Sequence, residues 1–156
     1  MNIKTRLEHK IPPPVYGLFT GLLIWMLNKW LPSLEIIPSN IQTLGWFILA
    51  FGVSIDIISL AQFHQNKTTL NPLKPDNAST IVATGMYRFS RNPMYLGMLI
   101  ALIGWAVQMG NIAGFACLPL FVWIITQMQI LPEERILKEK FGASYVDYLK
   151  RVRRWI

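Results

Sequence analysis

A chain of 156 residues is long enough for one domain, and this one is 53% apolar and only 15% charged, which is unusual for a soluble domain. The net charge of +7 would suit nucleic acid, but no stretch interleaves aromatic and basic residues as RNA-binding sheets do. The single cysteine, Cys117, excludes an internal disulfide, and the two distant histidines, His9 and His64, form no metal-ligand cluster. We therefore expect no nucleic-acid partner and no metal.

The apolar residues fall into four runs, which predict helices over residues 13–31, 41–63, 94–109 and 112–131. A membrane-spanning helix needs roughly 20 apolar residues, and flanking residues extend the two shorter runs to that length. A soluble bundle is the alternative, but no run shows the polar face that its helices would need. No small-residue cleavage site follows the first run, so it is not typical of a signal peptide. The sequence predicts an all-α integral membrane bundle of four transmembrane helices, with residues 1–156 as a single domain.

Small residues and prolines predict how these helices pack. Gly97, Ala101 and Gly104 form one stripe on the third helix, which would allow close contact with a neighbour. Gly110 and Asn111 form a tight link, so the third and fourth helices should be an antiparallel hairpin. Pro119 is expected to kink the fourth helix.

The positions of the basic residues predict the orientation of these helices. Of the fifteen lysines and arginines, only Lys29 falls in the first or third loop. The other fourteen lie in the N-terminal segment, in residues 64–93 and in residues 132–156. Under the positive-inside rule these three segments are cytoplasmic, which agrees with an even number of spans. We expect a multi-pass protein with both termini in the cytoplasm, most simply in a bacterial inner membrane, and contact with anionic membrane lipids.

The two long cytoplasmic segments carry most of the polar chemistry. In residues 132–156, apolar residues recur every three or four positions, which predicts an amphipathic tail lying on the membrane and broken at Gly142. Residues 85–97 read GMYRFSRNPMYLG, with arginines, tyrosines and an asparagine where the chain re-enters the membrane. A basic anchor with an aromatic belt is the simpler interpretation of that segment taken alone.

Residues 85–97 have the form G-x-Y-x-x-x-R-[HN]-P-x-Y-x-G, and the pair Glu133 and Glu134 is followed by FGASYVDY at residues 141–148. In this order and spacing, the two segments resemble the signature of the isoprenylcysteine carboxyl methyltransferase and phospholipid methyltransferase superfamily. The resemblance covers about residues 66–154. It implies a methyltransferase that uses S-adenosyl-L-methionine, held in a cytoplasmic loop over the last helical hairpin. The implied cofactor contacts are Ser79, Thr80, Ile81, Val82, Tyr87, Arg88, Asn92, Pro93, Met94, Tyr95 and Glu133.

The chemistry of these side chains suits that cofactor. A carboxylate such as Glu133 can bind its ammonium, and Arg88 or Arg91 could bind its carboxylate. Tyrosine rings can attract the sulfonium by roughly 0.5–2 kcal/mol. The structural alternative is that Glu133 and Glu134 only complement a helix dipole, for roughly 0.3–1 kcal/mol. No catalytic base is evident, so the catalytic residue stays unknown, with Arg91 and Glu134 as positioning candidates.

Two positions depart from the family pattern. Asn92 stands where many relatives carry histidine, so a pH switch there is lost. Gln129 lies one turn before Glu133, where the eukaryotic prenylcysteine enzymes have an arginine that contacts the substrate carboxylate. We therefore assign Gln129 to the acceptor, and its identity puts prenylcysteine specificity in doubt.

The acceptor itself stays open. A lipid-like or prenylated small molecule is expected, and an amino-phospholipid or a thiol are alternatives within methyl transfer. Outside it, Asp56 within a predicted span would suit a small transporter or assembly module, unless it pairs with a neighbouring helix or loop. The oligomeric state is not predicted.

Overall fold

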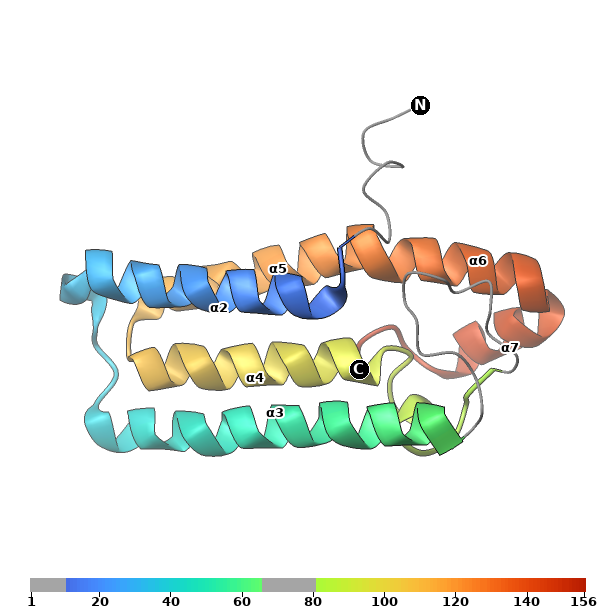
Figure 1. The fold of residues 1–156 in the computed structure, drawn as a ribbon, viewed down its shortest axis with the longest axis horizontal. Helices are drawn as coiled ribbons and strands as arrows, with labels where there is room; N and C mark the ends of the chain where they lie inside the picture. The colour runs from blue at the N-terminus through green and yellow to red at the C-terminus, as the bar shows by residue number, and fades with distance from the viewer. Residues whose placement is uncertain (1–10, 66–80) are drawn as a thin grey trace, which may run out of the picture.

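The computed structural model describes residues 11–65 and 81–156, and this part of the chain is helical with no β-strand. Four long stretches run side by side along the longest axis (Figure 1). They are α2 (Pro13–Trp30), α3 (Ser39–Gln65), α4 (Pro93–Met109) and the continuous stretch of α5 (Cys117–Ile125), a π-helical turn η5 (Thr126–Ile130) and α6 (Leu131–Phe141). A last helix, α7 (Ala143–Arg151), folds back beside the ends of α3 and α4, and three short 3-10 segments are η1 (Pro32–Leu34), η3 (Gly85–Arg88) and η4 (Ile112–Ala116).

Proline and glycine set the ends of these helices. Proline occupies the first turn of α2, α4 and α6, where a missing N–H costs little. Gly110, at φ 72°, ends α4 in the left-handed region, which confirms the predicted tight link. Pro119 lies in the first turn of α5, directly after the 3-10 segment η4. The π-helical turn precedes Pro132, and the Leu131 N–H reaches back to the Thr126 carbonyl, so the helix widens where proline lacks a donor.

The α3–α4 contact is made by glycines on both helices. A Cβ atom on Gly104 would lie 2.6 Å from the Gly45 carbonyl oxygen, and one on Gly97 would lie 2.7 Å from that of Gly52. The predicted small-residue stripe is therefore confirmed on α4, and α3 supplies its counterpart. Close backbone contact of this kind is typical of helix pairs in membranes.

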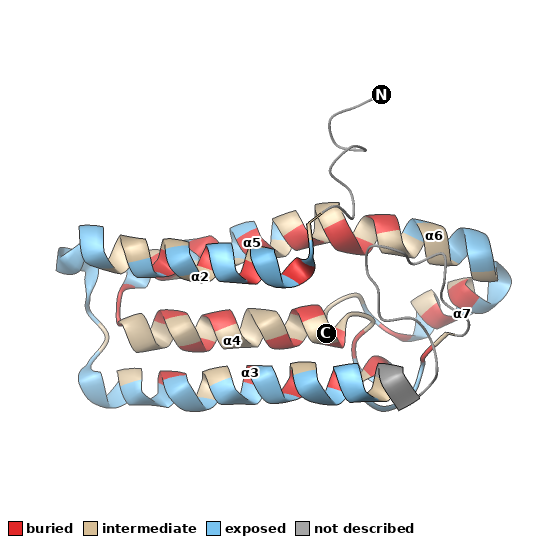
Figure 2. Cartoon of the chain, viewed as in Figure 1, coloured by how far each residue is buried: buried red, intermediate tan, exposed pale blue. Residues whose placement is uncertain are grey.

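The outer faces of the helices are apolar. Along α3, Leu44, Phe47, Phe51 and Ile57 are between 53% and 70% exposed, and Figure 2 shows this face in pale blue. Two helical stretches are long and apolar enough to cross a membrane: residues 39–62, with a mean hydropathy of 2.0, and 112–141, with 1.7. The interior lies between α2, α4 and α5, where Ile24, Phe121 and Ile125 are fully buried. These features fit a membrane protein.

The C-terminal tail differs from its prediction. The chain breaks at Gly142, at φ 53°, as expected. The apolar face of α7 does not lie outward, however: Tyr145, Tyr148 and Val152 are buried in a small core with Ile81 and Leu137. The periodicity of apolar residues does mark a buried face, but this face packs against the protein itself rather than against the membrane.

Candidate functional site

The two sequence motifs meet at one end of the bundle. There η3 and the start of α4 lie against α6, α7 and the chain that follows α7, and the C-terminus lies beside the first turn of α4 (Figure 1). Helix α4 begins at the buried Pro93 and α6 carries Pro132 in its first turn, so both helices present their first turns to this region. Residues about forty positions apart in sequence are thereby brought into contact.

Tyr95 and Glu133 form the central pair. The hydroxyl of Tyr95, buried in the first turn of α4, donates a 2.6 Å hydrogen bond to Oε1 of Glu133. That length is typical of a hydroxyl bound to a carboxylate. Glu133 is half-buried and has no ion pair with any other described residue. The described chain thus gives this carboxyl group a single, neutral hydrogen-bond donor, the Tyr95 hydroxyl.

Glu134, the next residue, has a different environment. Its Oε1 lies 2.9 Å from Arg91 Nη1, and Arg154 donates to both carboxylate oxygens, from Nε at 3.0 Å and from Nη2 at 2.7 Å. The side chains of Glu134 and Arg91 are each only 13% exposed. The hydrogen bond to Glu134 raises the pKa of Arg154 above its usual value. Glu134 therefore joins the motif before α4 to the C-terminal tail, and Nε of Arg91 stays buried without a hydrogen-bond partner in the described chain.

Backbone hydrogen bonds reinforce the same junction. The Arg91 N–H donates to the Arg153 carbonyl at 3.0 Å, and the Asn92 amide donates to the Arg154 carbonyl at 3.0 Å. Ser90 Oγ accepts from the Asn92 N–H at 3.1 Å. The Asn92 side chain, predicted to contact a cofactor, here fixes the tail, and its role toward a cofactor stays a prediction.

Buried tyrosines close the other side of the site. Tyr148 donates a 2.7 Å hydrogen bond to the Tyr87 carbonyl, and Gln62 at the end of α3 accepts from the Met86 N–H at 2.9 Å. Burial, followed by the charges of Tyr148, Glu133 and Asp56, raises the pKa of Tyr87 above its ordinary range. Tyr87 therefore lies within electrostatic range of Glu133 and Asp56.

The remaining predicted residues are spread over this end. Ser79 and Thr80 lie outside the described residues. Ile81 packs in the small core under α7, Val82 is buried, Met94 is half-buried and Arg88 is exposed. Gln129 is fully buried in the π-helical turn, where its amide donates to the Ile11 carbonyl at 3.0 Å and its Oε1 has no partner in the described chain.

Sequence reasoning missed the structural part of this site. Arg154 was counted only among the basic residues that set orientation, and Gln62 and Ser90 were not singled out. Four of the last seven residues are basic, and nothing in the sequence indicates which of them binds Glu134. Among the described residues, no group of three histidine, cysteine or acidic side chains could hold a metal ion.

Comparison with known proteins gives a consistent family. A family model described as phospholipid methyltransferase matches residues 41–144. Protein-S-isoprenylcysteine O-methyltransferase B of Arabidopsis thaliana is 29% identical over 114 residues, covering 69% of this chain and 58% of that protein. The protein-S-isoprenylcysteine O-methyltransferase of Schizosaccharomyces pombe is 28% identical over 119 residues, covering 76% and 50%.

A shorter relative, an uncharacterized protein of Haemophilus influenzae, is 40% identical over 63 residues, which are 40% of this chain and all of that protein. The chain spans half or slightly more of the length of the plant and yeast relatives named above. No solved structure matches.

Proposed function

Because this chain belongs to the phospholipid methyltransferase family, we propose that it is an S-adenosylmethionine-dependent methyltransferase for a lipid-like acceptor at the cytoplasmic membrane face. The observation that carries the proposal is the Tyr95–Glu133 pair, a half-buried carboxylate with one neutral partner inside the family motif. Such a carboxylate is available for a cationic ligand, whereas Glu134 is already bound to two arginines.

The side chains at this end fit the proposed cofactor. Glu133 would bind the ammonium, and the unpartnered Nε of Arg91 would donate to the carboxylate of the same molecule. The ring of Tyr87 is an aromatic surface beside these charges. Ser79 and Thr80, which lie outside the described residues, are proposed to contact the cofactor as well and to complete the cofactor-binding loop.

When bound, S-adenosylmethionine supplies a methyl group whose bond to sulfur breaks, leaving the electron pair on sulfur, as the acceptor's lone pair forms the new bond. The chain's task is to hold the two molecules in line and to exclude water. The junction of Glu134 with Arg91 and Arg154 keeps the motif fixed for that purpose. A carboxylate acceptor needs no base, whereas an amine or thiol must release a proton.

The membrane arrangement is also part of the proposal. The two long apolar stretches, together with α2 and α4, would make four spans with both termini in the cytoplasm, in a bacterial inner membrane. Cysteine labelling tests it, because Ile36 and Lys150 are both exposed but lie at opposite ends of the bundle. A membrane-impermeant reagent should label Ile36→Cys from outside and leave Lys150→Cys unlabelled until the cells are opened. The reverse pattern contradicts this orientation.

The names of the relatives favour an isoprenylcysteine-like carboxylate as the acceptor. An amino-phospholipid is the second candidate, favoured by the carboxylate of Asp56 facing an apolar groove. Methyl-labelled cofactor incubated with the purified protein and a membrane lipid extract would identify the product.

Cofactor binding tests the enzyme proposal directly. Glu133→Gln should weaken binding of S-adenosylhomocysteine by roughly ten- to a hundredfold, the worth of a charge-assisted hydrogen bond. Calorimetry on the detergent-purified full chain measures it. Glu139→Gln, an exposed acid on the same helix, is the matched control and should bind normally. Absence of any heat or thermal shift with the unmodified protein would remove the enzyme proposal, and normal binding by Glu133→Gln would remove the site assignment.

A further inference from the structure

Two arginines contact Glu134, but they do so with different edges of the guanidinium group. Arg154 donates from Nε to Oε1 at 3.0 Å and from Nη2 to Oε2 at 2.7 Å, so its fork of two N–H groups holds both carboxylate oxygens. Arg91 approaches Oε1 at 2.9 Å from Nη1, a nitrogen that does not belong to that fork. A carboxylate whose two oxygens already bind one fork can take only single contacts at its remaining lone pairs.

The fork of Arg91 is therefore not used on Glu134. Its Nε is buried and has no hydrogen-bond partner in the described chain, which is costly for a charged donor. The side chain is only 13% exposed, so water would screen a bond made there only weakly. A planar fork of this kind matches a carboxylate. Without Arg154, both oxygens of Glu134 would be open to it, and Arg91 would be bound by its own neighbour.

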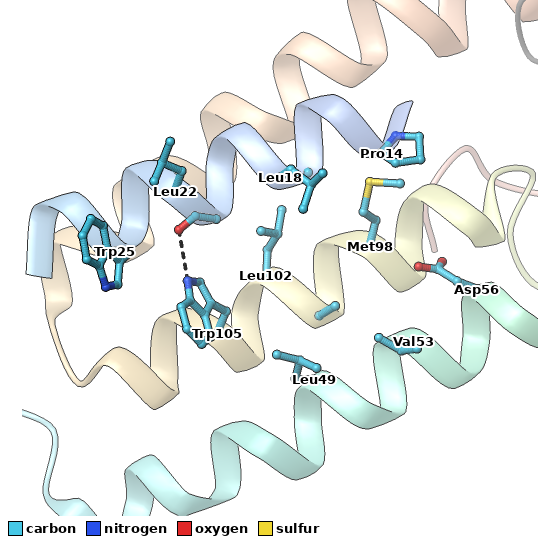
Figure 3. Close-up of a pocket in the computed structure, with 13 residues that line it drawn as sticks. Pro14, Leu18, Leu22, Trp25, Leu49, Val53, Asp56, Met98, Leu102 and Trp105 are labelled. Carbon is cyan, nitrogen blue, oxygen red and sulfur yellow. Dashed lines mark hydrogen bonds between the residues drawn. The ribbon is translucent and has the colours of Figure 1, made fainter. Parts of the chain in front are cut away.

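The other charged and hollow features near this end are less suited to a carboxylate. Figure 3 shows the apolar groove between α2, α3 and α4, in which Asp56 is the only charged lining residue. A negative side chain repels a carboxylate, and no described residue forms an ion pair with Asp56. Arg88, the other arginine considered for this role, is exposed, where water screens its charge.

The C-terminal tail has anchors that do not involve the Arg154 side chain. The Asn92 amide donates to the main-chain carbonyl of Arg154 at 3.0 Å. Val152 is buried in the small core under α7, and Trp155 packs against the larger core of the bundle. A substitution of the Arg154 side chain therefore removes the fork on Glu134 and leaves these anchors in place.

We propose that Arg154 is a positioning residue of the cofactor site: by holding both oxygens of Glu134, it keeps the fork of Arg91 free for the carboxylate of S-adenosylmethionine. The inference rests on the proposed function, because that cofactor supplies the carboxylate. Arg154 acts through Arg91 and does not contact the ligand itself. The tail then determines how tightly one group of the cofactor is bound, in addition to stabilising this end of the bundle.

Two probes that differ in one group test this: S-adenosylhomocysteine and its decarboxylated analogue, which keeps the amine but lacks the carboxylate. Calorimetry on the detergent-purified full chain measures both affinities. The unmodified protein should bind S-adenosylhomocysteine about tenfold more tightly than the analogue, the lower end of what a charge-assisted hydrogen bond contributes. Arg154→Gln should lose most of that preference and change the affinity for the analogue by less than about twofold. A purely structural role would weaken the binding of both probes alike.

Three further variants complete the test. Arg151→Gln removes the same charge from an exposed side chain at the end of α7 and should keep the preference. Arg154→Lys keeps the charge but not the fork, so it should lose part of the preference. In Arg91→Met the fork itself is absent, so the preference should be lost, and adding Arg154→Gln should change it no further.

Each outcome decides between the two proposals. An unchanged preference in Arg154→Gln, or in Arg154→Lys where the first variant does not fold, overturns the positioning role, and so does an equal loss of affinity for both probes. A further loss when Arg154→Gln is added to Arg91→Met also overturns it, because Arg154 would then contact the carboxylate directly. If the unmodified protein binds both probes equally, the proposed function stands and this inference fails. If it binds neither probe, the proposed function itself fails.

Discussion

Between α3 and α4 the backbones of two helices meet directly, whereas at the end of the bundle beside η3 the chain is joined through ion pairs and hydrogen bonds. Gly45 and Gly104 bring main-chain atoms into contact along the helix pair. At the polar end, Arg91, Glu134 and Arg154 join segments that are distant in sequence. The helix pair depends on glycines that carry no Cβ atom, whereas the polar end depends on charges and hydrogen bonds. Different substitutions should therefore disrupt each region.

The largest effect is expected in the helix pair. Gly104→Val should lower the free energy of unfolding by about 3 kcal/mol, because its Cβ would lie 2.8 Å from Leu49 Cα and backbone cannot move aside easily. Thermal unfolding in detergent measures it. Gly21→Ala is the control, since its Cβ would lie 3.8 Å from a Leu102 methyl group and should cost nothing measurable. A Gly104→Val protein that melts like the unmodified one would contradict the close packing.

The polar end should respond to charge rather than size. Glu134→Gln should lower the free energy of unfolding by about 2 kcal/mol, because it leaves the nearly buried Arg91 without its partner. The cost is below that of a fully buried pair because Arg154 is 35% exposed. Limited proteolysis should also cut the C-terminal tail faster.

The control for this change is the exposed pair of Asp147 and Lys150, whose side chains are 65% and 71% exposed. Asp147→Asn should change stability by less than about 0.5 kcal/mol. Equal protease resistance of Glu134→Gln and the unmodified protein would show that the tail is held by its apolar core alone.

Alkali should loosen the polar end before the helix pair. Burial raises the pKa of Tyr148 from about 10 to about 12, and burial raises the pKa of Tyr145 as well. Since the folded state holds these protons more tightly than the unfolded chain, the stabilisation is complete below pH 10 and is lost as the pH rises toward 12. Stability measured between pH 8 and pH 12 should therefore fall above pH 10. Tyr148→Phe should cost about 1 kcal/mol at neutral pH and show a smaller alkaline decline.

The two regions also differ in how far the sequence predicts them. Glycine spacing and apolar runs indicate the helices and the α4 stripe, because both depend on local residue types. The partners of Gln62 and Arg154 depend on how segments fold back on one another, and no local pattern encodes that. The apolar face of α7 was assigned to the membrane for the same reason: periodicity shows that Tyr145 and Tyr148 are buried, but not by what.

The sequence motif predicts which residues belong to the candidate site but does not distinguish the contacts that each of them makes. Asn92 and Arg91 belong to the signature, yet the structure gives both a hydrogen bond to the C-terminal tail, to the carbonyls of Arg154 and Arg153 respectively. Glu133 and Glu134 are adjacent acids that the sequence could not distinguish by chemistry. Their different partners follow from the direction each side chain takes at the start of α6, which only the folded chain reveals.

The smallest effect on cofactor binding is expected at Gln129, which lies in the π-helical turn between α5 and α6. It stands one turn before Glu133 but turns inward, and its amide binds the Ile11 carbonyl ahead of α2. Gln129→Ala should therefore change the affinity for S-adenosylhomocysteine by less than about threefold, below 1 kcal/mol. It should lower stability by about 1 kcal/mol, since the Ile11 carbonyl loses its donor. Use of the methyl acceptor should change as well, because Oε1 of Gln129 has no hydrogen-bond partner in the described chain. Calorimetry and competition between labelled acceptors measure the two effects separately. Loss of cofactor binding in Gln129→Ala would place this residue with Glu133 and remove the assignment of Gln129 to the acceptor.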